Sequence, residues 1–250
     1  MFSIVVPTFC SEKVIVPLLE SLVRQSNRDF ELVLSDGASP DATTQVVETF
    51  REQLPSLTVD SRVDTGIYDA INIGIGFARG RWVLVMGADD QLASHDVLEK
   101  LKHIALACDE PIIYGDVRID GSNGMVPDGS RYGGQFTLAR ILGQNICQQA
   151  MMYRRDIFDS IGMFDTRYRL WADWHFALKA FNAVPTRWVD LVVAVYGASG
   201  ASSRATDSRF QADFKGIVAR LMIERPPNVA LLRALMKRAY WRLAELSHRP

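Results

Sequence analysis

The sequence predicts an α/β fold in which helices flank a mostly parallel sheet, and two observations support this class. Apolar runs typical of buried strands alternate along the chain with segments whose apolar residues recur at helical spacing. The predicted strands also end at turns rich in Gly, Pro, Ser and Asp. With 250 residues the chain can form one large α/β domain, or one domain with a small extension.

Composition excludes several functional classes. A formal net charge of -1 argues against a general nucleic-acid binder. The three cysteines are too few and too far apart for a disulfide framework or a zinc site. No segment reaches the roughly 18 consecutive apolar residues of a membrane span, and the first residues do not resemble a signal peptide. We therefore expect a cytoplasmic protein that can rest on the inner face of a membrane.

The first half of the chain begins as a strand–helix–strand unit. Residues 2–6 and 30–34 read as buried strands, and residues 12–25 as the helix between them. The turn after the second strand holds Asp36, at a position where an acidic side chain commonly faces a ribose or base. Either Asp41 or Thr43 can begin the next helix, which we expect to run through Phe50.

A short strand at residues 57–59 precedes a helix predicted over residues 67–78, whose apolar stripe includes small residues suited to close packing. Asp64 and Asp69 lie near the start of this helix. They can be partners of the helix dipole or can bind ligand hydroxyls, and the residues alone leave both interpretations open. The chain lacks the glycine-rich phosphate loops of dinucleotide-binding oxidoreductases and P-loop proteins.

An apolar run at residues 82–86 ends in Gly87, Ala88, Asp89 and Asp90, and the chain is organised around this stretch. Carboxylates at the C-terminal end of a buried strand suit a metal and phosphate site. Alternatively, the two acids cap a helix that begins near Ser94.

The second half continues with predicted strands at residues 112–117 and 187–195, and with a glycine-rich loop at 121–134 that could shape an acceptor site. A helix at 173–181 begins with Asp173, and a loop of small residues follows at 196–203. Helices are predicted at 207–223 and 228–246. Residues 228–250 carry five basic residues and one glutamate among apolar and aromatic side chains. Such a helix can lie on an anionic membrane, or can pack against the rest of the chain or a second subunit as a homodimer.

Four motifs, in this order, carry a family resemblance: VVPTF at residues 5–9, SDGASPD at 35–41, DTGIYDAIN at 64–72 and GADD at 87–90. Together they resemble the family 2 glycosyltransferases with the GT-A fold, particularly those that build bacterial surface polysaccharides and glycolipids. The resemblance covers about residues 1–205. It implies a Rossmann-like mixed, mostly parallel sheet, with a nucleotide-sugar half at about 1–118, an acceptor half at about 119–205 and a C-terminal helical extension at 206–250.

The resemblance also implies roles for individual residues. Asp89 would hold Mg²⁺ or Mn²⁺, Asp173 would be the general base of an inverting transfer, and Asp36 and Asp64 would hold the base and ribose of a UDP-, GDP- or dTDP-sugar. From the residues alone, Asp173 can equally be an N-cap or first-turn acid. The remaining candidates for the donor nucleotide are Pro7, Thr8, Tyr68, Asn72, Ala88 and Asp90. The candidates for the phosphate or for a glycan or glycolipid acceptor are Gln148, Gln149, Trp171 and His175.

Three positions depart from the family pattern. Gly87 stands where relatives often carry the first acid of Asp-x-Asp, Gln148 where they often carry His, and His175 where many carry a second acid. A charged His175 would lower the pKa of Asp173, or the side chain could bind the acceptor. Two other functions are compatible with the sequence: a degenerate nucleotide-binding partner protein, and a sugar-phosphate nucleotidyltransferase. The second is disfavoured because no lysine-containing glycine-rich loop opens the chain.

Overall fold

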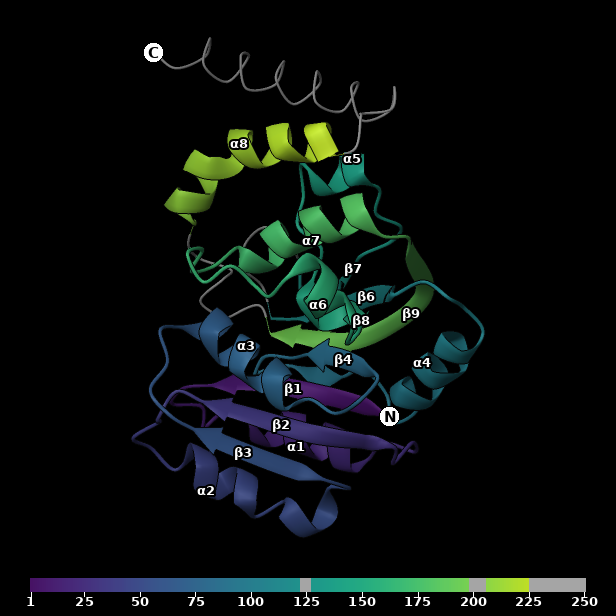
Figure 1. Cartoon of the computed structure of the whole chain (residues 1–250). Coiled ribbons are helices and arrows are strands. Elements are labelled where there is room, and N and C mark those ends of the chain that lie inside the picture. The colour runs from purple at the N-terminus through teal and green to yellow at the C-terminus, as the bar shows by residue number, and fades with distance from the viewer. Residues whose placement is uncertain (122–126, 198–205, 225–250) are drawn as a thin grey trace.

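The computed structural model describes residues 1–121, 127–197 and 206–224, and the strands among them form a single sheet (Figure 1). Its strand order is β3-β2-β1-β4-β8-β6-β9-β5, with β7 paired to β6. Six strands run in one direction, and β5, β7 and β8 run against them, so the predicted mixed and mostly parallel sheet is confirmed. The strands are β1 (Phe2–Thr8), β2 (Phe30–Asp36), β3 (Leu57–Ser61), β4 (Trp82–Val85), β5 (Gln91–Leu92), β6 (Ile112–Asp120), β7 (Arg131–Tyr132), β8 (Met151–Arg154) and β9 (Thr186–Gly197).

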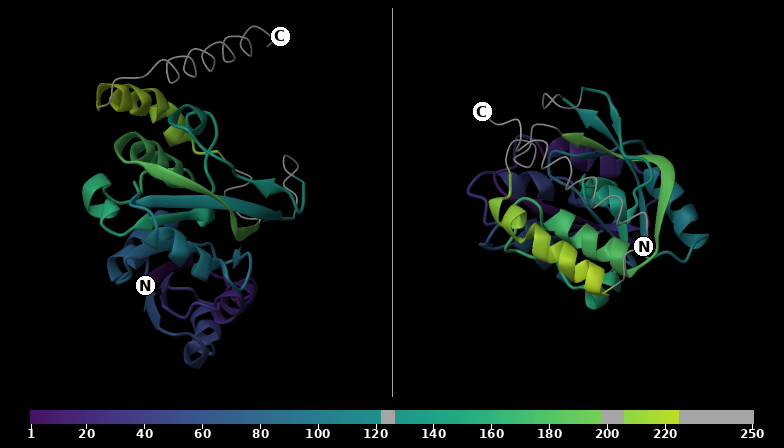
Figure 2. Two further views of the ribbon diagram at one scale, coloured as in Figure 1. Left: turned by 90° about the vertical axis from the view of Figure 1, so that its right-hand side faces the viewer. Right: turned by 90° about the horizontal axis from the view of Figure 1, so that it is seen from above.

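Helices cover both faces of this sheet, as Figures 1 and 2 show from three sides. The helices are α1 (Val16–Val23), α2 (Thr43–Glu48), α3 (Ile67–Phe77), α4 (Val97–Leu106), α5 (Leu138–Ile141), α6 (Ile157–Ile161), α7 (Ala172–Ala183) and α8 (Ser208–Glu224), with short 3-10 turns η1 (Arg51–Gln53) and η2 (Gln148–Ala150). Helices α1, α2 and α4 pack on one face, and α3 and α5 to α8 on the other.

The alternation of side chains along the central strands builds the two cores. In β1, Ile4 and Val6 contribute to the core under α1, whereas Val5 contributes to the core under α3. All seven residues of β1 and of β2 are buried, which explains why both read as largely apolar runs in the sequence. A Cβ on Gly74 of α3 would lie 2.6 Å from Cγ1 of Val5, so the predicted close packing of this helix requires a glycine there.

Several predicted boundaries move by a few residues. Helix α1 begins at Val16 rather than at residue 12, because residues 12–15 form a turn whose amides at Val14 and Ile15 bond to Ser11 O. Helix α2 ends at Glu48, and η1 follows it. Within the loop predicted at 121–134, the described part includes β7, which pairs with β6. Residues 122–126, the predicted loop from 198 and the predicted helix at 228–246 lie outside the described residues.

The helical extension predicted from residue 206 begins with α8, which packs on α7 and lies outermost among the labelled helices in Figure 1. Phe210, Phe214 and Leu221 of α8 belong to the same core as α3 and α7. None of the described helices is both long enough and apolar enough to cross a membrane.

Candidate active site

A cavity of about 250 Å³ opens at the C-terminal ends of the parallel strands β1 and β4, where α/β folds place their ligands. It brings together six of the predicted site residues from segments far apart in the sequence: Pro7, Tyr68, Asp89, Gln148, Gln149 and Asp173. Gly87 and Gly197 also line it, as does Arg169. The carboxylate predicted to hold a metal and the carboxylate predicted to act as a base therefore face the same space.

Asp173 lies in the first turn of α7, and three donors hold its side chain. Its Oδ1 accepts hydrogen bonds from the Tyr68 hydroxyl at 2.9 Å and from the Trp174 amide at 2.7 Å. Its Oδ2 accepts from Asn145 Nδ2 at 3.1 Å. Burial raises the pKa of Asp173 to about 6, although these three hydrogen bonds oppose that rise. A carboxylate with this pKa is ionised near neutral pH and still basic enough to take a proton.

Tyr68, on α3, links this carboxylate to the segment before α7. Its hydroxyl lies 2.8 Å from Leu170 O as well as 2.9 Å from Asp173 Oδ1, yet a phenol carries a single proton. Burial and the nearby Asp173 raise the pKa of Tyr68 well above its ordinary value, so the phenol stays protonated. It can donate to Asp173 when that group is ionised, and to Leu170 O when it is not.

The two adjacent carboxylates after β4 have different surroundings. Asp90 is 1% exposed, and its oxygens accept from the amides of Gly87 at 2.7 Å and of Gly197 at 3.3 Å. Burial, and then the charge of Asp89, raise the pKa of Asp90 to about 7. Asp89 instead presents an exposed side chain to the cavity, where partial desolvation raises its pKa. Asp90 thus closes the turn and joins it to the end of β9, while Asp89 is free to bind a ligand.

The alternative role for this pair, capping a helix near Ser94, is wrong. Helix α4 begins at Val97 with Asp96 at its N-cap position, and β5 lies between it and the two acids. The closed turn also accounts for Gly87. A Cβ at this position would lie 2.9 Å from Asp90 Oδ2 and 3.0 Å from Asp89 Oδ1, so an aspartate here would crowd both carboxylates.

The cavity offers a divalent ion a small set of protein ligands. No group of three or more Asp, Glu, His or Cys side chains is placed to hold a metal within residues 1–121, 127–197 and 206–224. Of the two adjacent acids after β4, Asp89 supplies the accessible carboxylate, since Asp90 is turned toward backbone amides. This donor set fits Mg²⁺ or Mn²⁺ in one way: one carboxylate, completed by water and by the phosphate oxygens of a substrate.

A second group of predicted residues gathers at the ends of β1 and β2. Asp36 is 1% exposed and accepts hydrogen bonds from Thr8 Oγ1 at 2.9 Å, from Ser61 Oγ at 2.7 Å and from the amide and hydroxyl of Ser39. Burial would raise the pKa of Asp36, but these bonds outweigh it and hold the pKa below its ordinary value. A Cβ on Gly37 would lie 2.8 Å from Asp64 Oδ2, so this acid lies directly against the same loop.

Eight of the predicted residues do not line the cavity: Thr8, Asp36, Asp64 and Asp90, described above, and Asn72, Ala88, Trp171 and His175. Asn72 exchanges two hydrogen bonds with the backbone of Phe164, at 2.9 and 3.0 Å, so both ends of its amide are occupied. Trp171 packs edge-on against Trp174 and Phe210, in the aromatic layer between α7 and α8.

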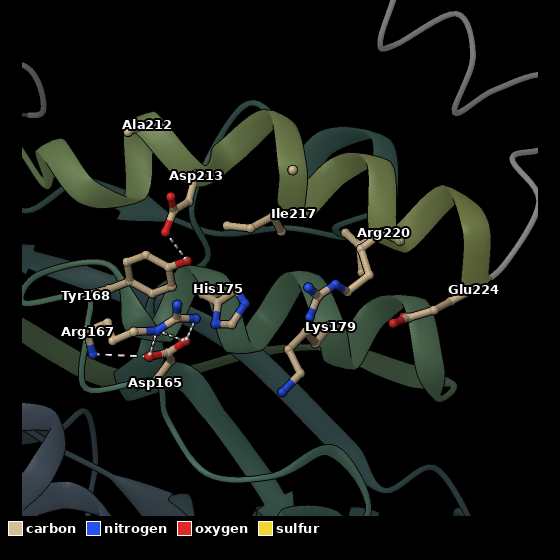
Figure 3. Close-up of a pocket in the computed structure, with 12 residues that line it drawn as sticks. Asp165, Arg167, Tyr168, His175, Lys179, Ala212, Asp213, Ile217, Arg220 and Glu224 are labelled. Carbon is tan, nitrogen blue, oxygen red and sulfur yellow. Dashed lines mark hydrogen bonds and ion pairs between the residues drawn. The ribbon is translucent and has the colours of Figure 1, made fainter.

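The expectation that a charged His175 acts on Asp173 needs correction. His175 points away from the cavity, into a groove between α7 and α8 (Figure 3). Burial, and then the charge of Lys179, lower its pKa to about 4, so the imidazole is neutral at physiological pH. The physical reason is helical geometry, since residues two apart on a helix face different directions.

Gln148 presents an unpaired donor in the wall of the cavity. Its side chain is 8% exposed, and its Oε1 accepts from the Tyr153 hydroxyl at 3.0 Å. Its Nε2 is buried and has no partner among the residues that the structure describes. Buried donors without a partner are rare in proteins, and this one lies where a ligand oxygen could accept from it.

Arg169 was not predicted from the sequence. Its exposed side chain lines the cavity, and it forms no ion pair within the described part of the chain. Its position four residues before the predicted base is the one signal in the sequence that could have indicated it.

Comparison with known proteins identifies the family of the chain. The model of the family described as "Glycosyl transferase family 2" matches residues 3–162. A relative from Mycobacterium tuberculosis, named PGL/p-HBAD biosynthesis glycosyltransferase, is 40% identical over 217 residues, which is 84% of this chain and 82% of the relative.

Two solved structures share the fold. TarS of Staphylococcus aureus (residues 1–349, in complex with UDP) superposes with a TM-score of 0.76 at 22% identity, covering 94% of this chain and 70% of that one. A mannosyltransferase from Pyrobaculum calidifontis, in complex with GDP-Man and Mn²⁺, superposes with a TM-score of 0.61 at 19% identity, covering 97% and 75%. These likenesses confirm the predicted GT-A fold. The match to the family model and the identity to the mycobacterial enzyme show that the chain belongs to glycosyl transferase family 2 and is a glycosyltransferase.

Proposed function

We propose that this enzyme transfers a sugar, with inversion, from a nucleoside-diphosphate sugar to a hydroxyl group of a glycolipid or surface-glycan acceptor. The observation that carries the proposal is the convergence of Asp89 and Asp173 on one cavity at the C-terminal edge of the sheet. In the proposed reaction, Asp89 would act on the leaving diphosphate and Asp173 on the attacking hydroxyl. Inversion follows if the base and the leaving group lie on opposite sides of the anomeric carbon.

Asp173 is the proposed general base. Its pKa of about 6 leaves it ionised near neutral pH, and the donors from Tyr68 and Asn145 fix its orientation. It would take the proton of the acceptor hydroxyl as the oxygen attacks the anomeric carbon and the bond to the diphosphate breaks. General-base assistance of this kind typically contributes about 10²- to 10⁴-fold to a rate.

Charge on the diphosphate needs balancing, and two groups of the cavity are suited to that task. Asp89 is the proposed ligand of Mg²⁺ or Mn²⁺, and a divalent ion held there would neutralise the departing diphosphate. Arg169 adds a fixed positive charge from the protein. The unpaired Nε2 of Gln148 would donate to an oxygen of the phosphate or of the acceptor.

The donor is proposed to be a nucleotide sugar because the two structural neighbours were solved with UDP and with GDP-Man. Asp36, Thr8 and Asp64, at the ends of β1 and β2, would shape the nucleotide side of the site. A glycolipid or surface-glycan acceptor is proposed from the name of the mycobacterial relative and from TarS, which is named poly(ribitol-phosphate) β-N-acetylglucosaminyltransferase. Contact with the inner membrane face and a homodimer stay predictions, because residues 228–250, which suggested them, lie outside the described residues.

The departure at Gly87 does not favour a degenerate protein. The glycine fits the closed turn that Asp90 makes, and both Asp89 and Asp173 are retained. The two interpretations differ in a measurable way, because a degenerate binding protein would bind a nucleotide without consuming a donor.

The test is hydrolysis of a panel of UDP-, GDP- and dTDP-sugars, with and without Mn²⁺, followed together with thermal unfolding. We expect one donor to be consumed and to stabilise the wild type in a metal-dependent way. Asp173→Asn should still be stabilised but should not consume the donor, and Asp89→Ala should lose the effect of metal. Asp109→Ala removes an exposed acid outside the cavity and serves as the matched control. Full activity in both Asp89→Ala and Asp173→Asn would refute the assignment.

A further inference from the structure

A second, larger cavity lies between α7 and α8 (Figure 3), and Asp173 is not among the residues that line it. Its volume is about 580 Å³. His175 and Lys179 line it from α7, Gly216 and Arg220 from α8, and Asp165 and Arg167 from the loop before α7. We call this cavity the α7–α8 groove. No role proposed above uses it.

The groove is lined by three acids, Asp165, Asp213 and Glu224, and by three bases, Arg167, Lys179 and Arg220, and these bases differ in how closely they are paired. Asp165 pairs with Arg167 through both of its oxygens, and Asp213 accepts from the Tyr168 hydroxyl at 3.0 Å. Lys179 and Arg220, in contrast, have no carboxylate within 4.0 Å in the part of the chain that the structure describes. Lys179 Nζ donates to Ile161 O at 2.6 Å, which satisfies a hydrogen bond but does not neutralise the charge. Lys179 and Arg220 thus line the same cavity from opposite helices, with the Lys179 amine directed toward Ile161 O.

The wall of the groove on α8 contains an unexplained glycine. Gly216 lies inside the helix, where glycine is less favourable than alanine. A Cβ there would meet nothing within 4 Å, so close packing does not require the glycine. Its effect is to leave space one turn from Arg220.

The pKa of His175, which lines the groove from α7, is affected by the same charges. After burial, the nearby charges of Lys179, Arg167 and Arg220 act to lower its pKa, and Asp165 acts to raise it. Asp213 and Glu224 are the other acids that line the groove, from the α8 side. An anion held between Lys179 and Arg220 would offset the cations and raise the pKa of His175.

We propose that the α7–α8 groove binds a phosphate group, with Lys179 and Arg220 as its charged donors. Both side chains supply several N–H donors to phosphate oxygens, and the open space beside Gly216 admits the group to which the phosphate is attached. The phosphate can be free in solution or part of a lipid headgroup, since the same two cations would recognise either. This proposal is independent of the proposed transfer reaction.

The test follows the ring protons of His175 by NMR while inorganic phosphate is added, with His175→Gln used to assign the signal. We expect the pKa of His175 to rise and the phosphate affinity read from this signal to fall about tenfold or more in Arg220→Gln and in Lys179→Gln. Lys215→Gln removes an equal charge from α8 outside the groove and should leave the affinity unchanged. The proposal would be overturned if the His175 signal did not change on addition of phosphate, or if it changed as much in Arg220→Gln as in the wild type. Phosphate bound in the active-site cavity would not produce this pattern.

Sedimentation with vesicles separates the two sources. Phosphatidylcholine vesicles with phosphatidic acid are compared with phosphatidylcholine alone. If the vesicles with phosphatidic acid capture the protein, and if Arg220→Gln and Lys179→Gln weaken this capture, the ligand is a lipid phosphate. A response of His175 to inorganic phosphate without such capture identifies a free phosphate. If neither substitution weakened the capture by vesicles, and if the His175 signal did not respond to phosphate, the groove would be refuted as the binding site.

Discussion

Replacing Tyr68 by Phe tests the assignment of Asp173 as the base. The substitution removes one hydroxyl and keeps the ring, which stacks on Phe164 at a centroid distance of 5.8 Å. In the wild type the hydrogen bond from Tyr68 to Asp173 Oδ1 stabilises the ionised carboxylate, whereas burial favours the protonated form, and the substitution removes only the first effect. The pKa of Asp173 should therefore rise above its wild-type value of about 6.

The size of the rise follows from the shared proton. A hydrogen bond to a charged group contributes about 1.5–3 kcal/mol, and 1.36 kcal/mol corresponds to about one pH unit. Because the phenol proton is shared between Asp173 Oδ1 and Leu170 O, the low end of that range applies. The pKa of Asp173 in Tyr68→Phe should thus lie near 7, about one unit above its wild-type value of about 6.

The assay is the pH dependence of kcat/KM for sugar transfer, whose acidic limb reports the base in the free enzyme. Tyr68→Phe should be about fivefold slower than the wild type at pH 6 and nearly equal to it at pH 8. Tyr168→Phe is the matched control, because this buried tyrosine also donates to an aspartate, Asp213, but does not contact Asp173. An acidic limb that stays in place in Tyr68→Phe, or that survives in Asp173→Asn, would refute the reasoning.

Four further predictions follow from the same contacts. Arg169→Gln should raise the KM of the donor about tenfold or more, as initial rates would show, and Arg169→Lys should recover part of the loss because it restores the charge. Gly87→Asp should lower stability by about 1–3 kcal/mol in thermal unfolding, because its Cβ would crowd Asp90. Burial raises the pKa of Asp90 in the folded protein to about 7, so the contribution of Asp90 to stability is present near pH 4 and is lost as the pH rises through 7. In denaturant unfolding, the free energy of unfolding of Asp90→Asn should therefore decline less over that pH range than that of the wild type. Gly74→Ala should destabilise α3 by about 1–3 kcal/mol, whereas Gly76→Ala, with open space around it, should stabilise by about 0.5–1 kcal/mol.

The central strands were predictable because β1 and β2 are buried on both faces, which leaves largely apolar runs at residues 2–6 and 30–34 of the sequence. The start of α1 could not be predicted, because residues 12–15 resemble the helix in composition. Only the folded structure shows that they form a turn whose amides bond to Ser11 O. Acidic residues at strand ends were also predictable as site candidates. Their roles within the site differ for reasons that spacing does not encode.

Asp89 and Asp90 illustrate that difference. They are neighbours in the sequence, yet one faces the cavity and the other bonds to Gly197, 107 residues further along the chain. The partners of Asp36 likewise come from β1 and from the end of β3. Arg169 was not predicted for the same reason, because only the folded chain places it in the same cavity as Asp89. Such contacts arise from the strand order and the path of the loops, which a one-dimensional pattern does not contain.

Helix α8 supports the active site, although the sequence suggests that it starts a separate extension. Asp207, immediately before it, is 6% exposed and accepts from the amides of Leu170 at 3.0 Å and Trp171 at 3.4 Å. Leu170 in turn supplies the carbonyl that shares the Tyr68 proton with Asp173. A buried carboxylate thus connects the start of α8 to the backbone that carries both Arg169 and the proposed base. The expected boundary at residue 205 follows the limit of the family resemblance, whereas the hydrogen bonds of Asp207 cross that boundary to the segment that precedes the proposed base.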